Sequence, residues 1–492
     1  MTTGIDAVFE ARQAEHRAPS AVWGTFGPEG LRHVGATGEV DGALPGADTA
    51  YRIASCTKSF TATALLALRD AGALQLDQPV TDFVPAFADV ALPTADSPVP
   101  TVRMLLTMAA GFPTDDPWGD RQEAITDDEL DALLRRGLSF DSVPGTTFAY
   151  SNLGYALLGR VVEHAAGRPY REVVETTILR PLGLAATGFT VDVPAPGGLA
   201  TGYRRHDDAW EPLPFSGPGG FSPIGGLFST VTDLTRWARW LASASDPEGR
   251  GDVDGVLSRA SRREMQQAHR TVPGRGAHPA AYGFGLFVEQ YPDLGPVVSH
   301  SGGYPGFSAH MRWHPASGLG AVAFENATYA QVSVPLTQAL DGVLADEGAA
   351  PVVTPWPETR AAQEAVEHVV RGGDVPPGLF SENVELDQPL ERRRAAWQEE
   401  AARVGGLLPR ADGTAAGSGS GPGSSSARSG SGSGSRSAAG GLDVEAGEES
   451  TAPSHLVWRV PGGRGVLRVE IRLTPERPPR VQTVRVRAEA PH

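Results

Sequence analysis

The segment from Phe60 to Leu68 carries no charged residue and has the composition of a helix. A helix at a protein surface keeps a polar stripe, whereas a helix that is apolar or small on every side is buried. The chain must therefore fold around this helix, and Gly72 is placed to end it. With 492 residues, the chain is long enough for this domain and a second one.

Lys58 lies just before this segment and is the only lysine in the chain, since the other 41 of its 42 Lys and Arg residues are arginine. Arginine stays protonated in proteins, but a desolvated lysine can release its proton. Positions i and i+3 share a helix face, so Lys58 can exchange a proton with Ser55. The helix N-terminus also offers N–H groups and a positive dipole end to an oxyanion. The alternative is a chance survivor on a solvated face, against which the apolar surroundings argue.

A second candidate segment contains Tyr150 and Asn152, just before the next expected helix. A neighbouring ammonium lowers the pKa of a phenol, so Tyr150 could take the proton of Ser55 and pass it to a leaving group. Asn152 could hydrogen-bond both Lys58 and a substrate carbonyl. Taken alone, the segment fits better a turn that merely caps a helix.

A third candidate segment is His300-Ser301-Gly302-Gly303, at the end of an expected strand. Adjacent glycines let a substrate approach the strand backbone closely. The N–H groups of Gly303 and Ser55 could form a two-donor oxyanion hole, and His300 could place a donor on the substrate. The alternative is a glycine-rich hairpin loop with a surface histidine.

Together and in this order, the three segments resemble the serine β-lactamase and penicillin-binding-protein superfamily, with its Ser-x-x-Lys motif. Tyr150-Ser151-Asn152 is similar to the class C β-lactamase branch, with its related esterases, D-aminopeptidases and D,D-peptidases. The resemblance covers roughly residues 5–345. Similar flanking segments are Gln75-Leu-Asp-Gln-Pro-Val, Leu105-Leu-Thr-Met-Ala-Ala-Gly-Phe and Gly225-Gly-Leu-Phe-Ser-Thr-Val-Thr-Asp-Leu.

The resemblance implies that Ser55 is acylated and that Lys58 and Tyr150 share the proton transfers. Which of the two is the base stays open, because close titrating groups share macroscopic pKa values. The implied substrate-binding residues are Asn152, which orients Lys58 and the substrate, and His300, Ser301, Gly302 and Gly303. The family mechanism uses no metal, and we expect neither a metal nor a cofactor.

One departure from the family pattern concerns the substrate. Penicillin-recognising members usually carry Lys-Thr-Gly where this chain has His300-Ser301-Gly302, and the Lys and Thr help to hold a substrate carboxylate. Histidine is mostly neutral above its usual pKa of about 6.5, so carboxylate binding should be weaker. The expected substrates are therefore esters, or amides of D-residue peptides. The pattern His-x-Gly occurs among D-aminopeptidase-like and peptidase-like relatives, so it does not suggest a dead enzyme.

Strand patterns stand at both ends of this region with helices between them, which predicts one sheet built from both ends, an α/β sandwich. The resemblance implies a β-lactamase/transpeptidase-like (α+β) sandwich of an antiparallel sheet with helices. We expect the hydrolase domain at 1–348, a linker with a possible helix at 349–378 and a small α+β accessory domain at 379–492. A Gly/Ser tract at about 411–441 interrupts that domain and should be flexible.

Charge and composition limit the partners. The net charge of −16 argues against nucleic acid and anionic membranes. No signal-peptide pattern and no long apolar stretch occurs, so a cytoplasmic location is expected. We therefore expect a serine hydrolase that cleaves a small ester, amide, peptide or β-lactam-like substrate through an acyl-Ser55 intermediate. The alternative is a catalytically weak, ligand-sensing, penicillin-binding-like scaffold, and the oligomeric state is open.

Overall fold

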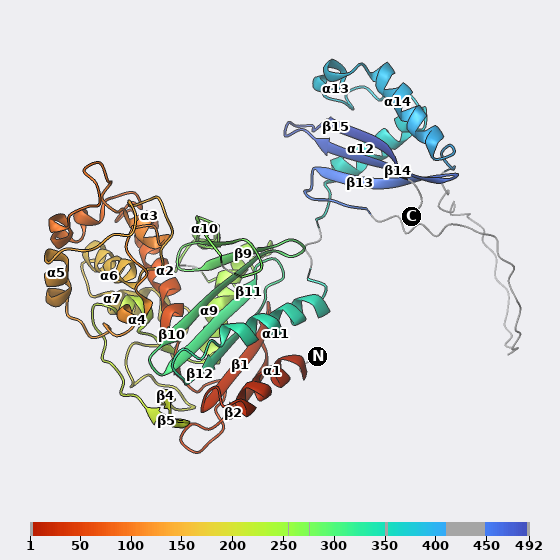
Figure 1. The fold of residues 1–492 in the computed structure, drawn as a ribbon. Helices are drawn as coiled ribbons and strands as arrows, with labels where there is room; N and C mark the ends of the chain where they lie inside the picture. The colour runs from red at the N-terminus through yellow and green to blue at the C-terminus, as the bar shows by residue number, and fades with distance from the viewer. Residues whose placement is uncertain (1–2, 254, 275, 350–352, 410–447, 490–492) are drawn as a thin grey trace, which may run out of the picture. The chain divides into compact units, whose positions relative to one another are not determined.

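The computed structural model describes residues 3–253, 255–274, 276–349, 353–409 and 448–489. The chain divides into two units, Met1–Pro351 and Val352–His492, which are described separately (Figure 1). The predicted Gly/Ser tract at about 411–441 lies outside the described residues.

An antiparallel sheet built from both ends of the first unit organises that unit (Figure 1). Within the described residues it has eight strands, in the order β2-β1-β12-β11-β10-β9-β8-β7. Their bounds are β1 Ser20–Gly27, β2 Gly30–Gly38, β7 Arg270–Val272, β8 Ala280–Tyr282, β9 Phe287–Tyr291, β10 Gly295–Tyr304, β11 Phe307–His314 and β12 Leu319–Glu325. The N-terminal hairpin closes against the last strand, with Val22 of β1 opposite Phe324 of β12. The predicted sandwich with an antiparallel sheet is confirmed.

Helices cover both faces of this sheet. Helices α1 (Thr3–Ala14) and α11 (Ser333–Asp346) pack on one face, where Phe9 stacks on Trp23. Helix α9 (Val231–Ala242) covers the other face, and its Trp237 stacks on Phe60 of the central helix. The sheet is therefore the middle of three layers.

The region between β2 and β7 is mostly helical. Its helices are α2 Thr57–Asp70, α3 Val102–Leu106, α4 Asp116–Gly119, α5 Asp127–Arg135, α6 Asn152–Ala166, α7 Tyr170–Val174, α8 Ser222–Gly225 and α10 Arg259–Met265. Two small strand pairs accompany them, β3 (Tyr51–Arg52) with β6 (Phe228–Ser229) and β4 (Tyr203–His206) with β5 (Ala209–Pro212). Strand β3 lies outside the main sheet and leads into α2.

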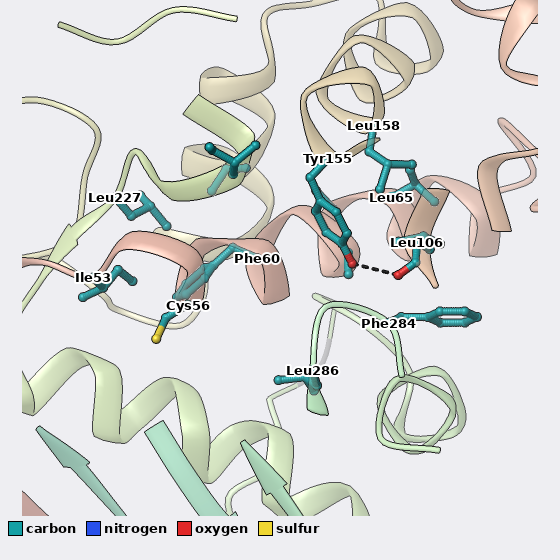
Figure 2. Close-up of a cluster of buried hydrophobic side chains, with 14 of the residues drawn as sticks. Ile53, Cys56, Phe60, Leu65, Leu106, Tyr155, Leu158, Leu227, Phe284 and Leu286 are labelled. Carbon is teal, nitrogen blue, oxygen red and sulfur yellow. Dashed lines mark hydrogen bonds between the residues drawn. The ribbon is translucent and has the colours of Figure 1, made fainter. Parts of the chain in front are cut away.

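Helix α2 is the buried central helix that its sequence predicts. Every residue from Thr57 to Leu66 is buried. Figure 2 shows Phe60 and Leu65 of α2 within a cluster that also contains Ile53, Leu106, Tyr155, Leu158, Leu227, Phe284 and Leu286. The helix ends before Gly72, whose positive φ is a conformation that glycine adopts without strain. The charged group of Lys58 is therefore carried into the protein interior.

The second unit packs helices on a three-stranded antiparallel sheet. Its elements are α12 Pro357–Val370, α13 Glu382–Asp387, α14 Leu390–Arg403, β13 His455–Gly462, β14 Gly465–Leu473 and β15 Val481–Glu489. Val366 and Val369 of α12 pack with Trp397 of α14 and Val469 of β14. Helix α12, which the sequence suggested as part of a linker over 349–378, thus contributes to the core of this unit. No helix in the described residues is long and apolar enough to cross a membrane.

Candidate active site

Ser55 lies in the turn between β3 and α2. It belongs to a short 3-10 helix, Ala54–Cys56, that runs directly into α2. The preceding Ala54 has a positive φ, in the left-handed region that residues other than glycine rarely adopt. Strained backbone of this kind is held by its surroundings and gathers at functional sites. The turn places Ser55 at a pocket, although only 5% of the residue's surface is exposed.

The ammonium group of Lys58 is fully buried beside Ser55. Its Nζ donates to the Oγ of Ser55 at 2.9 Å, to the Oδ1 of Asn152 at 2.7 Å and to the carbonyl oxygen of Ile224 at 2.9 Å. The same nitrogen lies 5.0 Å from the ring centre of Tyr150. The structure therefore brings together residues that come from three separate segments of the sequence.

Burial lowers the pKa of Lys58 from 10.5 to about 8, because the charged form is desolvated. The carboxylates of Asp116, Asp120 and Asp115 act against this shift without cancelling it. Burial also raises the pKa of Asp120 to about 7, although Lys58 opposes the change. A lysine that titrates near pH 8 has a usable neutral fraction at neutral pH, as a general base requires.

Tyr150 shows a pKa shift opposite to the one predicted. Burial and the nearby carboxylates of Asp116 and Asp120 raise its pKa well above 10, although a hydrogen bond with Ser55 opposes them. The predicted lowering by Lys58 is therefore wrong, because desolvation of the phenolate outweighs any attraction from the ammonium. The raised pKa keeps the Tyr150 hydroxyl protonated at neutral pH, which suits a proton donor better than a base.

Asn152 is the first residue of α6. It is fixed there by Asp115 to Asp120, a segment that includes the short helix α4 and that we call the acidic loop. One carboxylate oxygen of Asp115 accepts from the N–H of Asn152 at 2.6 Å, and the other accepts from the N–H of Leu153 at 2.9 Å. The Nδ2 of Asn152 donates to Asp116 at 3.1 Å. These bonds satisfy N–H groups that a helix start leaves unpaired. They also hold the side chain with its Oδ1 toward Lys58.

His300 lies in β10 and is almost fully buried. Its Nδ1 lies 2.7 Å from the carbonyl oxygen of Ser301, and its Nε2 lies 3.0 Å from the hydroxyl of Tyr282. Because a carbonyl oxygen only accepts, the Nδ1 donates, and in a neutral ring the Nε2 accepts from Tyr282. The ring thus uses its N–H within the protein, which argues against the predicted donor to substrate. The thiol of Cys56 donates to the carbonyl oxygen of His300 and ties β10 to the Ser55 turn.

Gly302 and Gly303 allow close contacts beside the Ser55 turn. A Cβ on Gly302 would lie 2.3 Å from the carbonyl oxygen of Ile53 and 2.8 Å from the Cβ of Ala54. A Cβ on Gly303 would lie 2.8 Å from the ring of Tyr329. Glycine at 302 therefore lets β10 pack directly on the turn that carries the nucleophile candidate.

A pocket of about 440 Å³ joins these elements. Its lining includes five of the residues that the sequence singled out, Ser55, Tyr150, His300, Ser301 and Gly303. Lys58, Asn152 and Gly302 lie behind this lining. No group of three or more His, Cys, Asp or Glu within the described ranges is arranged to hold a metal ion.

Sequence reasoning missed the acidic loop and two tyrosines of this site. Asp116, Asp120 and Tyr329 line the pocket, and Asp115 and Tyr282 support its walls. The paired aspartates shortly after the family-like segment that begins at Leu105 offered one local signal. Nothing in their spacing shows that they surround Lys58.

Comparisons with known proteins agree with this geometry. The β-lactamase family model matches residues 5–344. The chain is 28% identical to penicillin-binding protein 4* of Bacillus subtilis, over 53% of this chain and 57% of that protein. It is 30% identical to the esterase EstB of Burkholderia gladioli, over 68% of this chain and 93% of that one. Among solved structures, a D-stereospecific amidohydrolase from Streptomyces sp. superposes with a TM-score of 0.57 at 27% identity, covering 69% of this chain and 98% of that one.

Proposed function

This chain belongs to the β-lactamase family, and from that premise we propose that it is a serine hydrolase acting through an acyl-Ser55 intermediate. One observation carries the proposal. The Nζ of a fully buried lysine with a pKa of about 8 lies 2.9 Å from the Oγ of a serine that lines a pocket. A serine hydroxyl is a weak nucleophile unless a base of this kind accepts its proton.

In the proposed mechanism Lys58 is the first base. Neutral Lys58 takes the proton of Ser55 as the Oγ forms a bond to the substrate carbonyl carbon. When the tetrahedral intermediate collapses, Tyr150 gives its proton to the leaving oxygen or nitrogen and regains one from the Lys58 ammonium. The high pKa of Tyr150 suits this donor role, and the lowered pKa of Lys58 suits the base role.

Water then resolves the acyl-enzyme by the reverse proton path. Water attacks the ester carbon, its proton passes to the Tyr150–Lys58 pair, and Ser55 leaves with a proton restored to its Oγ. We propose that the N–H groups of Ser55 and Gly303 stabilise the oxyanion in both steps. Asn152 orients Lys58, and His300 ties β10 to β8 through its bond to Tyr282.

We propose two substrate classes ahead of penicillins. One is esters, and the other is amides of D-residues. The ring of His300 is buried and bonded within the protein, so it cannot replace the lysine that holds a carboxylate in penicillin-recognising members. Two similar proteins carry the names esterase and D-stereospecific amidohydrolase. We assign hydrolysis to the first unit, whose domain limits we place at 1–348. The cytoplasmic location stays a prediction.

Phosphonylation by a serine-directed phosphonate probe, measured by intact mass, tests the nucleophile. We expect one adduct on the wild type and none on Ser55→Ala, with Ser59→Ala as the matched control because Ser59 lies on the same helix and bonds only within the protein core. An equal adduct on Ser55→Ala would refute the assignment.

Turnover of a p-nitrophenyl acyl ester separates the hydrolase from the scaffold alternative. We expect many equivalents of product per enzyme. A stoichiometric burst without turnover would indicate a ligand-sensing protein instead. A parallel series of β-lactams, short-chain esters and D-amino-acid amides then ranks the substrate classes.

A further inference from the structure

A second pocket shares a wall with the active-site pocket. It has a volume of about 690 Å³, and Tyr329 lines both pockets. The hydroxyl of Tyr329 donates to the Oδ2 of Asp120 at 3.0 Å, and Asp120 belongs to the active-site pocket. The same hydroxyl lies 3.4 Å from the Nη1 of Arg121, which belongs to the second pocket. The two pockets therefore share the side chain of Tyr329.

The lining of this second pocket is cationic in a chain whose net charge is −16. No Asp or Glu occurs among its described lining residues. We call it the arginine pocket, after Arg17, Arg121, Arg204 and Arg205. Concave sites with charge of one sign raise the local concentration of oppositely charged ligands.

The arginines of this pocket keep donors for a ligand. Arg17 pairs with Glu15 at 3.2 Å, and Arg204 pairs with Glu211 and Arg205 with Asp208 at 2.8 Å each on the exposed β4–β5 hairpin. Solvent screens exposed pairs of this kind, so they contribute little to stability, and a guanidinium has further N–H donors to offer. For Arg121, no ion-pair partner occurs among the described carboxylates. An anion entering the pocket thus gains contacts without breaking a costly one.

Hydrogen bonds to a backbone carbonyl oxygen hold one wall of the arginine pocket in place. The carbonyl oxygen of Tyr203, at the start of the hairpin, accepts from the N–H of Thr328 at 2.8 Å and from its Oγ1 at 3.0 Å. The next residue, Tyr329, has a positive φ, a conformation that surrounding structure must impose on a residue other than glycine. The hairpin and the residue shared by the two pockets are therefore fixed together.

We propose that the arginine pocket binds an oxyanion, a carboxylate or phosphate, on a substrate whose scissile bond lies at Ser55. Arginine recognises both groups by paired N–H donors, and Trp210 and Leu213 give the connecting chain an apolar surface. The inference rests on the proposed function. It places recognition of a substrate anion in the arginine pocket, beside Tyr329. The family lysine that would otherwise hold such an anion is missing at position 300.

Paired p-nitrophenyl esters test this inference. Each pair has the same acyl length, and one member ends in a carboxylate or a phosphate; a second series carries the anion on the leaving group. At low ionic strength we expect kcat/KM for the anionic member of at least one pair to exceed that of the neutral member about tenfold, as one charge-assisted contact provides. The preference should fall at high salt, about 0.5 M, where charges are screened within a few ångströms.

Variants assign this preference to the arginine pocket. Arg121→Ala and, separately, Arg204→Ala with Arg205→Ala should bring the anionic-to-neutral ratio close to one. Arg135→Ala, which removes an exposed arginine of α5 with an ion pair to Asp131, should keep the wild-type ratio. The kcat/KM values of the carboxylate and phosphate esters, compared with each other, show which oxyanion the pocket prefers.

The negative outcomes distinguish failure of the arginine pocket from failure of the proposed function. Hydrolysis of neutral esters with no anionic preference in either series would overturn the arginine pocket and leave the proposed function standing. A preference that survives in both arginine variants would also overturn it. No hydrolysis of any ester, together with no Ser55 adduct, would overturn the proposed function itself.

Discussion

The buried amine of Lys58 should titrate near pH 8, and this can be measured without interference. Because Lys58 is the only lysine in the chain, protein labelled with ε-¹³C-lysine gives one lysine signal. The folded protein should show a midpoint of about 8, and the urea-unfolded chain one near 10.5. Burial is the largest cause of the difference, so the shift requires the folded packing around α2.

The same shift predicts how stability depends on pH. The difference between 10.5 and about 8 corresponds to about 3 kcal/mol, since one pKa unit is about 1.4 kcal/mol. The folded state has the lower pKa, so the unfolded state binds more protons between these values and stability rises with pH. Below pH 8 the full cost of burying the charge is present, and it is relieved progressively up to pH 10.5.

The variant Lys58→Met isolates this effect, because it keeps an unbranched side chain as far as the ε position and removes the titrating nitrogen. Asn152 Oδ1 and the Ile224 carbonyl oxygen lose a donor, at about 1–3 kcal/mol each, while the cost of the buried charge disappears. Near pH 7 the variant should therefore differ from the wild type by only a few kcal/mol in free energy of unfolding. Arginine is the poorer choice, since its larger head group would have to fit a fully buried site.

Urea denaturation of both proteins at pH 7 and pH 10 checks the magnitude. The stability of the wild type relative to Lys58→Met should increase by about 2–3 kcal/mol between the two values. Other groups titrate in both proteins, so their contributions largely cancel in the difference. A lysine signal with a midpoint above 10, or a difference that does not change with pH, would refute the reasoning.

Three further predictions concern neighbouring parts of the site. Tyr150→Phe should lower kcat for a D-amino-acid amide by about 10²–10⁴ with little change in KM, because the leaving amine must be protonated, and an unchanged kcat would remove Tyr150 from the proton path. Asp115→Ala should lower the free energy of unfolding by about 1–2 kcal/mol in urea, because two N–H groups at the start of α6 lose their acceptor; no loss would contradict the capping role. Gly302→Ala should slow phosphonylation by a serine-directed phosphonate at least tenfold, since the added methyl meets the Ser55 turn, while Gly342→Ala, in open space on α11, should react at the wild-type rate. Equal rates in the two glycine variants would show that close packing at 302 is not needed.

The sequence by itself determined the central helix and the spacing of its functional groups. A run without charge from Phe60 to Leu68 can only be buried, and an interval of three residues puts Ser55 and Lys58 on one side of a helix. The strand patterns at both ends of the first unit likewise predicted one sheet built from both ends. Each of these conclusions depends on a local sequence pattern, which can be read without knowing the tertiary structure.

Only the tertiary structure decided the electrostatics of the site. Asp115, Asp116 and Asp120 come near Lys58 because α4 packs against α6 and α6 packs against α2, contacts between distant parts of the chain that no local pattern records. The direction of the Tyr150 shift follows from how deeply its hydroxyl is buried, which sequence neighbours do not show. The inward bonds of His300 depend on the pairing of β10 with its neighbours. Burial and long-range proximity set protonation, and both are properties of the assembled fold.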